Sequence, residues 1–198
     1  MSISQFLFLI LTYAIAAIPF GLVLAKIFAK KDIRELGSKN IGATNVARVI
    51  GKKLGFCTLI LDGMKGALMV IIARFGFHDS GNLSLFLLLV GAVAVLAHIY
   101  PIYLRFKGGK GVATALAVLL AIDSFVGFLA CCFWILSFRL FRISAISSLI
   151  AIFSSIFLSL ALGAPASQVG FCCFLFILIL LRHKENLSRL LKGEEKKF

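Results

Sequence analysis

Long apolar runs alternate along the chain with short polar stretches that carry most of its lysine and arginine. A transmembrane helix needs about 20 mostly apolar residues, and four of the runs approach that length whereas three are shorter. In chain order the runs are 6–25, 54–73, 83–103, 112–122, 125–138, 143–162 and 169–181. The pattern predicts an all-α integral membrane protein with about seven transmembrane helices, some of them short or re-entrant.

The composition also indicates a membrane protein. Apolar residues make up 61% of the 198 residues and the mean hydropathy is +1.07, which leaves too little polar surface to cover a soluble globule of this size. No basic residue precedes the first run, and no small-residue cleavage pattern with a soluble domain follows it, so we interpret this run as a span rather than a signal peptide. We expect residues 1–198 to form a single polytopic membrane domain.

The distribution of positive charge predicts which ends of the chain face the cytoplasm. Residues 112–138 could form one span through Asp123 and Ser124, or two segments that break there. If they break, every loop lysine and arginine except Arg74 falls on one side of the membrane, whereas a single span divides these residues almost evenly. Because cytoplasmic loops are enriched in both residue types, the break is favoured, with the N-terminus outside and the C-terminus in the cytoplasm. A re-entrant pair would keep the same sidedness.

These cytoplasmic loops explain the formal net charge of +13, which therefore does not indicate nucleic-acid binding. No aromatic residues are interleaved with the basic ones, and no known nucleic-acid-binding module is recognisable. The five cysteines lie in apolar runs without the spacing of metal ligands. We expect neither a disulfide nor a metal site.

Three polar clusters lie next to the apolar runs, and the expected topology places all three at the cytoplasmic face. We name them the first cluster (residues 37–48), the glycine-lysine loop (residues 107–114) and the tail cluster (residues 182–191). Each combines hydrogen-bond donors with cationic side chains, and the first two also contain glycines. This composition suits the binding of an anionic substrate at a membrane surface.

The glycine-lysine loop precedes a short apolar segment, so it could form the N-terminal entry of a helix. A helix start offers N–H groups and partial positive charge, glycines let a ligand approach the backbone, and a lysine adds a full charge. The candidate phosphate-binding residues are therefore Gly108, Gly109, Lys110 and Gly111. The spacing of a nucleotide P-loop is absent. The alternative is a cytoplasmic turn whose lysines only enforce the topology.

The first cluster mixes hydroxyl, amide and guanidinium groups, so several donors could converge on one oxyanion. Its candidate substrate-binding residues are Ser38, Asn40, Thr44, Asn45 and Arg48. Asn45 and Arg48 would share a face if this stretch is helical. The alternative is a solvated cytoplasmic loop with ordinary turn and cap residues.

In the tail cluster, His183 and Asn186 lie three residues apart at the end of the last apolar run, close to Glu185. Histidine is the side chain best suited to proton transfer near neutral pH, and Asn186 could orient it or bind substrate. We treat His183 and Asn186 as candidate catalytic residues and Glu185 as a supporting residue. The alternative is an interfacial helix end whose basic residues serve the helix dipole and the topology.

Three further ionisable residues lie inside apolar runs. Asp62 and Lys65, three residues apart, would share one face of a helix. Ionisable groups at membrane depth are costly, so we expect this pair to face other helices rather than lipid. His98 lies near the end of the third run, just before Pro101. We assign structural or supporting roles to Asp62, Lys65 and His98.

Taken in order, the three clusters resemble the signatures of the bacterial acyl-phosphate-dependent glycerol-3-phosphate acyltransferase family. The matching segments are GSKNIGATNVAR (37–48), GGKGVAT (108–114) and RHKENLSRLLKGEE (182–195), with DGMKG (62–66) and HIYP (98–101) between them. Their order, their spacing and the chain length also agree with the family. Two positions depart from it, because Ile41 stands where the family usually has proline, and Ala97 where glycine commonly precedes the histidine.

The resemblance implies a multi-pass enzyme of the bacterial cell (inner) membrane with its active site facing the cytoplasm. Such enzymes transfer a fatty acyl group from acyl phosphate to the 1-hydroxyl of sn-glycerol 3-phosphate, which gives lysophosphatidic acid and phosphate in the first step of phospholipid synthesis. The implied partners are these two substrates and membrane lipids, without nucleic acid, an obligate protein partner, a cofactor or a metal. Either His183 or the leaving phosphate would accept the hydroxyl proton.

Other functions explain less of the sequence. The histidine-four residues-aspartate motif of other glycerol-3-phosphate acyltransferases is absent, because Leu83, Tyr103 and Ser188 stand at the fifth position after the three histidines. A transporter or channel for a small organic anion could use the same cations, but the chain shows no convincing internal repeat. A small membrane scaffold would leave the three polar clusters without a purpose.

Overall fold

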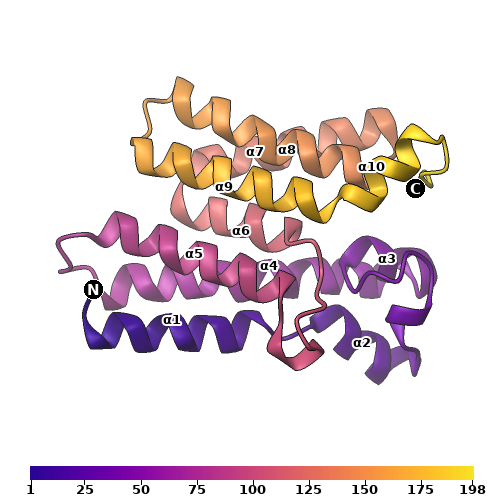
Figure 1. The fold of residues 1–198 in the computed structure, drawn as a ribbon, viewed down its shortest axis with the longest axis horizontal. Coiled ribbons are helices and arrows are strands. Elements are labelled where there is room, and N and C mark those ends of the chain that lie inside the picture. The colour runs from indigo at the N-terminus through magenta and orange to yellow at the C-terminus, as the bar shows by residue number, and fades with distance from the viewer. The chain divides into compact units, whose positions relative to one another are not determined.

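The computed structural model describes all of residues 1–198, and every regular element is helical (Figure 1). The all-α class expected from the apolar runs is therefore confirmed. The chain forms two compact units, Met1–Val118 and Leu119–Phe198, and the boundary between them falls inside one short helix.

The first unit contains five complete α-helices, two short 3-10 turns and the start of a sixth helix. These are α1 (Ile3–Ala16), α2 (Phe20–Ala29), η1 (Ile33–Glu35), α3 (Ala43–Val49), α4 (Lys52–Gly76), α5 (Leu83–Ile99), η2 (Ile102–Leu104) and α6 (Val112–Ile122). The long helix α4 packs against α1, α2, α3 and α5, and the helices α1, α4 and α5 lie side by side (Figure 1). The candidate residues of this unit are therefore arranged around α4.

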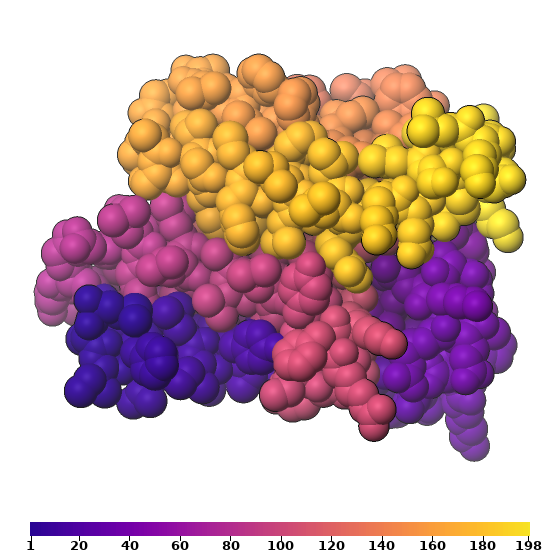
Figure 2. Space-filling model, viewed as in Figure 1, coloured from indigo at the N-terminus to yellow at the C-terminus, as the bar shows by residue number.

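Prolines explain two of the helix ends in the first unit. Proline lacks a backbone N–H and fixes its own φ, so it interrupts a helix. The first apolar run is accordingly divided at Pro19 into α1 and α2, rather than forming the continuous helix that its hydropathy suggests. Pro101 follows α5 in the same way. The segment after α5 lies at the surface beside the indigo α1 (Figure 2), where the Tyr13 hydroxyl donates to the Tyr100 carbonyl at 2.7 Å.

The first unit exposes large apolar side chains and buries polar ones. Phe6, Leu7 and Phe56 are more than half exposed, whereas Thr58 and Asp62 are buried. Lipid tails are as apolar as these side chains, so exposure to a bilayer carries no penalty, while a polar group at membrane depth needs a partner inside the protein. This distribution is typical of a membrane protein.

The second unit contains the end of α6 followed by α7 (Ser124–Phe141), α8 (Ser144–Ala161), α9 (Ala166–Arg182) and α10 (Lys184–Leu191). Its three long helices pack in chain order, α7 against α8 and α8 against α9. Helix α8 buries a row of serines, and Ser148 accepts a hydrogen bond from the Trp134 indole at 3.2 Å. Small polar residues of this kind let membrane helices approach closely.

Asp123 separates α6 from α7. Its carboxylate accepts the backbone N–H groups of Phe125 at 3.2 Å and Val126 at 3.1 Å, which makes it the N-cap of α7. The same carboxylate accepts a hydrogen bond from the Gln168 amide at 2.8 Å, beside the start of α9. The break predicted at Asp123 and Ser124 is confirmed.

Five helical segments are long and apolar enough to cross a membrane, with α1 and α2 counted together as one segment of 27 residues. The pair α9 and α10, bent by 59° between Arg182 and Lys184, adds a sixth if it is one span. Helix α6 is shorter, and its 11 residues rise about 16 Å. The protein is thus an all-helical integral membrane protein with five to six candidate spans.

Candidate active site

The first cluster forms a loop that leads into α3, and Asn45 organises this loop. Its side-chain Oδ1 accepts the N–H of Ser38 at 2.9 Å, and its Nδ2 donates to the carbonyls of Asn40 at 2.8 Å and Leu36 at 3.0 Å. Gly37 is needed here because its φ is +59° and a Cβ would overlap the Asn45 side chain. The buried amide of Asn45 therefore serves the framework of the loop.

Other polar residues of the first cluster lie around this framework. Asn40 uses its Oδ1 to accept the backbone N–H two residues later, at 2.8 Å, where α3 begins. Ser38 is exposed, and the partly buried Thr44 and Arg48 lie one turn apart on α3. Because residues 43–49 are helical, Asn45 and Arg48 do share a helical face.

A small apolar core attaches the first cluster to α2. Ile33, Ile41 and Val46 are buried and pack with Leu22 and Ala25 of α2. Ile41, the position at which the family resemblance leads one to expect proline, is only 3% exposed. Burial of the isoleucine side chain stabilises the loop by removing apolar surface from water, whereas a proline would stabilise it by restricting φ.

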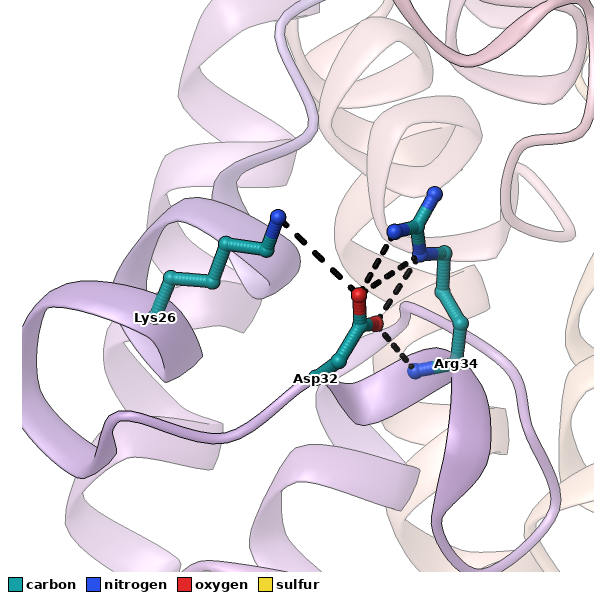
Figure 3. A network of polar contacts seen from close by, with 3 residues as sticks. All are labelled: Lys26, Asp32 and Arg34. Atoms are coloured by element: carbon teal, nitrogen blue, oxygen red, sulfur yellow. Dashed lines mark hydrogen bonds and ion pairs between the residues drawn. The ribbon is translucent and has the colours of Figure 1, made fainter.

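An ion-pair network next to the first cluster was not identified from the sequence (Figure 3). Asp32 accepts the backbone N–H of Arg34 at 3.0 Å and its Nε at 2.9 Å, and lies 3.9 Å from Lys26 Nζ. The hydrogen bonds from Arg34 hold the pKa of Asp32 well below its usual range, and the same contact raises the pKa of Arg34. The only sequence signal is an aspartate that could bond the backbone two residues later, which is common in turns.

The glycine-lysine loop pairs with the end of α5. The N–H of Gly108 donates to the Ile99 carbonyl at 3.0 Å, and the N–H of Gly109 donates to the His98 carbonyl at 3.2 Å. These two donors are engaged with α5, which differs from the phosphate contact expected of them. Lys110 is partly buried and precedes the start of α6, so its charge and the helix start remain the candidate anion-binding features of this loop.

Asp62, Lys65 and His98 form a buried ionic cluster in the first unit. Lys65 Nζ lies 3.0 Å from Asp62 Oδ1 and donates to the Ile18 carbonyl, just before Pro19, at 2.7 Å. His98 Nδ1 lies 3.7 Å from the same Asp62 oxygen, and none of the three side chains is more than 5% exposed. The expectation that Asp62 and Lys65 face the protein interior is confirmed.

In the second unit, His183 lies at the bend between α9 and α10. Its Nδ1 is 2.8 Å from the Ile179 carbonyl. A carbonyl can only accept, so Nδ1 carries the proton and Nε2 is the acceptor atom of the neutral ring. A general base acting through Nε2 requires this tautomer.

Asn186 is hydrogen-bonded to Glu195, a residue that the sequence did not single out. Asn186 Nδ2 donates to Glu195 Oε1 at 2.6 Å, and Arg189 Nε donates to Glu195 Oε2 at 2.7 Å. The predicted supporting residue Glu185 is exposed in the first turn of α10, where its charge suits the helix dipole. The one sequence signal for Glu195 is its place at the end of the third family-like segment.

Each unit therefore holds part of the predicted site. The first unit contains the first cluster, the glycine-lysine loop and the ionic cluster, and it brings the loop together with His98. The second unit contains the tail cluster with its glutamate partner.

Comparison with known proteins identifies the family. The family model for Glycerol-3-phosphate acyltransferase matches residues 6–193, which is nearly the whole chain. The chain belongs to the glycerol-3-phosphate acyltransferase family. A Glycerol-3-phosphate acyltransferase from Jannaschia sp. (strain CCS1) is 43% identical over 189 residues, covering 95% of this chain and 90% of the relative.

Solved structures of the family share the fold. A crystal structure of PlsY (YgiH), an integral membrane glycerol 3-phosphate acyltransferase, in its glycerol 3-phosphate form is 37% identical, with a TM-score of 0.92 over 98% of this chain and 96% of that one. The lysophosphatidic acid form of PlsY is 36% identical, with a TM-score of 0.88 over 98% and 95% of the two chains. The family predicted from the three clusters is confirmed, and the protein is an integral membrane acyltransferase.

Proposed function

We propose that this acyltransferase moves a fatty acyl group from acyl phosphate to the 1-hydroxyl of sn-glycerol 3-phosphate, giving lysophosphatidic acid and phosphate. The observation that carries the proposal is the likeness, over almost the whole chain, to PlsY in its glycerol 3-phosphate and lysophosphatidic acid forms. The choice of acyl phosphate as donor rests on the family-like segments of the sequence.

Ser38, Arg48 and Lys110 are the proposed phosphate-binding residues. Both substrates carry a phosphate group, and hydroxyl, guanidinium and ammonium groups are strong donors to phosphate oxygens. Several further residues shape the backbone around these donors. They are Asn40, Asn45, Gly108, Gly109 and Gly111. Thr44, in the first turn of α3, is a further proposed donor to phosphate.

His183 and Asn186 are the proposed catalytic residues, and they position the glycerol hydroxyl. The hydroxyl oxygen attacks the acyl carbonyl carbon, the bond between that carbon and the phosphate oxygen breaks, and the hydroxyl proton passes to His183 Nε2 or to the departing phosphate. Phosphate is a good leaving group, so positioning and electrostatic stabilisation suffice, without a covalent acyl-enzyme or a cofactor. The tautomer fixed by the Ile179 carbonyl supports a role for His183 Nε2.

The proposed location is a bacterial inner membrane, where residues 1–198 form a single polytopic domain. About seven segments, with α6 as a short one, would place the N-terminus outside and the C-terminus in the cytoplasm. The charge distribution supports this orientation, because Arg74 is the only loop cation on the outer side. Glycerol 3-phosphate would then arrive from the cytosol and acyl phosphate from the bilayer.

A comparison of acyl donors tests the function. Purified protein is incubated with labelled glycerol 3-phosphate and, in parallel, with acyl phosphate, acyl-CoA or acyl-carrier protein. Labelled lysophosphatidic acid is expected with acyl phosphate alone, and heat-inactivated protein controls for spontaneous acylation. Product from either thioester donor would contradict the proposed donor. Uptake of labelled anion into sealed vesicles without acylated product would contradict the enzyme function.

A further inference from the structure

The buried ionic cluster of Asp62, Lys65 and His98 has no step of its own in the proposed reaction. Ionisable groups at membrane depth are costly to bury, and they usually mark a functional region. Here Lys65 is engaged by Asp62 and by the Ile18 carbonyl, so the two opposite charges of the cluster are paired with each other. Its contacts with neighbouring segments indicate what it does.

The glycine-lysine loop is attached to residues of the ionic cluster on both sides of Lys110. Before Lys110, the N–H of Gly109 donates to the backbone carbonyl of His98 at 3.2 Å. After Lys110, the buried hydroxyl of Thr114 donates to the backbone carbonyl of Asp62 at 2.8 Å. Lys110 thus lies between two points that are fixed to the same cluster.

The His98 ring is also in direct contact with the loop. A Cβ built on Gly109 would overlap Nε2 of His98, so this edge of the imidazole lies against the glycine backbone. The Nδ1 atom faces Asp62 Oδ1 at 3.7 Å, and that oxygen lies 3.0 Å from Lys65 Nζ. A continuous series of contacts therefore connects Lys65, Asp62 and His98 to Gly109.

We propose that Asp62, Lys65 and His98 are positioning residues that hold the glycine-lysine loop, and with it Lys110, in the conformation that receives a substrate phosphate. The inference rests on the proposed acyl transfer. A cation that is already in place needs no rearrangement when the phosphate arrives, and a displacement of about 1 Å can cost about 100-fold in rate. The hydrogen bond from Lys65 to the Ile18 carbonyl fixes the far end of this series of contacts.

Compensating substitutions at Gly109 and His98 test the proposal. Gly109→Ala pushes the loop away from the imidazole, and we expect kcat/KM to fall by about 10- to 100-fold, mainly through a higher KM for a phosphate-bearing substrate. His98→Ala removes the ring and should give a weaker defect of the same kind. The double variant should be more active than Gly109→Ala alone, because the new methyl group fits the space that Nε2 has vacated.

Gly108→Ala is the matched control. A Cβ on Gly108 would overlap the backbone carbonyl oxygens of His98 and Ile99, and truncating a side chain does not remove a carbonyl. His98→Ala should therefore fail to restore Gly108→Ala. The melting temperature of each variant in detergent separates a misfolded protein from a folded one with a displaced loop.

Three results would decide against the proposal or against its premise. A double variant that melts like the wild type but is no more active than Gly109→Ala overturns the positioning role, and so does equal recovery of Gly108→Ala. If the alanine double variant does not fold, His98→Asn replaces His98→Ala, because asparagine keeps a polar group near Nδ1 and lacks the Nε2 volume. A wild-type protein that forms no product overturns the acyl transfer itself.

Discussion

At the scale of single residues, polar side chains at the site are held by partners that belong to the protein. Asn45 uses its amide on the backbone of the first cluster, His183 is held by a carbonyl of its own helix, and Asn186 is bonded to Glu195. Each contact restricts rotation of a side chain before any substrate binds. Preorganisation of this kind lowers the cost of reaching the transition state.

His183→Gln separates the two possible proton acceptors. Glutamine keeps a polar group near the Nε2 position and cannot take up a proton, so kcat should fall about 100- to 10,000-fold if His183 is the base. His183→Asn places its amide near Nδ1 instead and serves as the companion variant, and the exposed His78→Gln is the control. Steady-state kinetics of the three variants provide the measurement. Nearly unchanged turnover in His183→Gln would identify the departing phosphate as the acceptor.

Glu195→Ala should lower kcat about 10-fold or more. The variant lacks the carboxylate that accepts hydrogen bonds from Asn186 and Arg189. The Asn186 side chain can then rotate away from the orientation that the proposed reaction requires. The neighbouring Glu194 is exposed, so Glu194→Ala is a matched control with the same loss of charge. Acyl-transfer rates of the two purified variants, compared with their melting temperatures, test this. Equal activity of the two variants would show that Glu195 does not position Asn186.

The sequence identified His183 and Asn186 but not Glu195, and the reason is geometric. Histidine and asparagine three residues apart form a local pattern that does not depend on the rest of the chain. The bond from Asn186 to Glu195 depends on how the residues after α10 turn back, which periodicity does not encode. The contact between His98 and Gly109 was unpredictable for the same reason, since it joins two elements across a loop.

At the scale of helices, most candidate site residues lie in the segments between the long helices rather than inside them. Hydropathy predicts α4 and α8 well, because both are apolar runs bounded by polar or charged residues. It does not reveal the division of the first run at Pro19, because the flanking residues are as apolar as a span requires. The break at Asp123 was predictable because a charged residue there is also a good N-cap.

Asp123→Ala should destabilise the second unit by about 1 to 2 kcal/mol, since α7 loses its N-cap. Gln168 also loses an acceptor, whereas Asp123→Asn keeps an acceptor oxygen for the cap and should cost less. Thermal unfolding in a fixed detergent compares the two variants. Equal melting temperatures for the alanine and asparagine variants would show that the cap contributes little to stability.

At the scale of the whole molecule, the proposed function requires that the glycine-lysine loop and the tail face the same compartment. Lys107→Cys and Lys197→Cys, in a variant without the five native cysteines, should react with an impermeant maleimide in inverted vesicles and not in spheroplasts. Ser80→Cys, between α4 and α5, should show the reverse. Labelling of Lys107→Cys and Lys197→Cys from opposite sides would exclude a shared reaction centre, because a phosphate bound at Lys110 and the proposed catalytic residue His183 could not meet.

The spacing of Asp62 and Lys65 within α4 also bears on biogenesis. A lone charge at the centre of a helix costs roughly 2.5–3.5 kcal/mol when the translocon releases that helix into lipid. These two opposite charges lie 3.0 Å apart in the middle of the same helix, so the lysine has its counterion within α4 and the pair is neutral before α5 has been synthesised. Moving one of the two charges to a neighbouring helix would preserve the net charge of the finished protein but would slow the insertion of both segments.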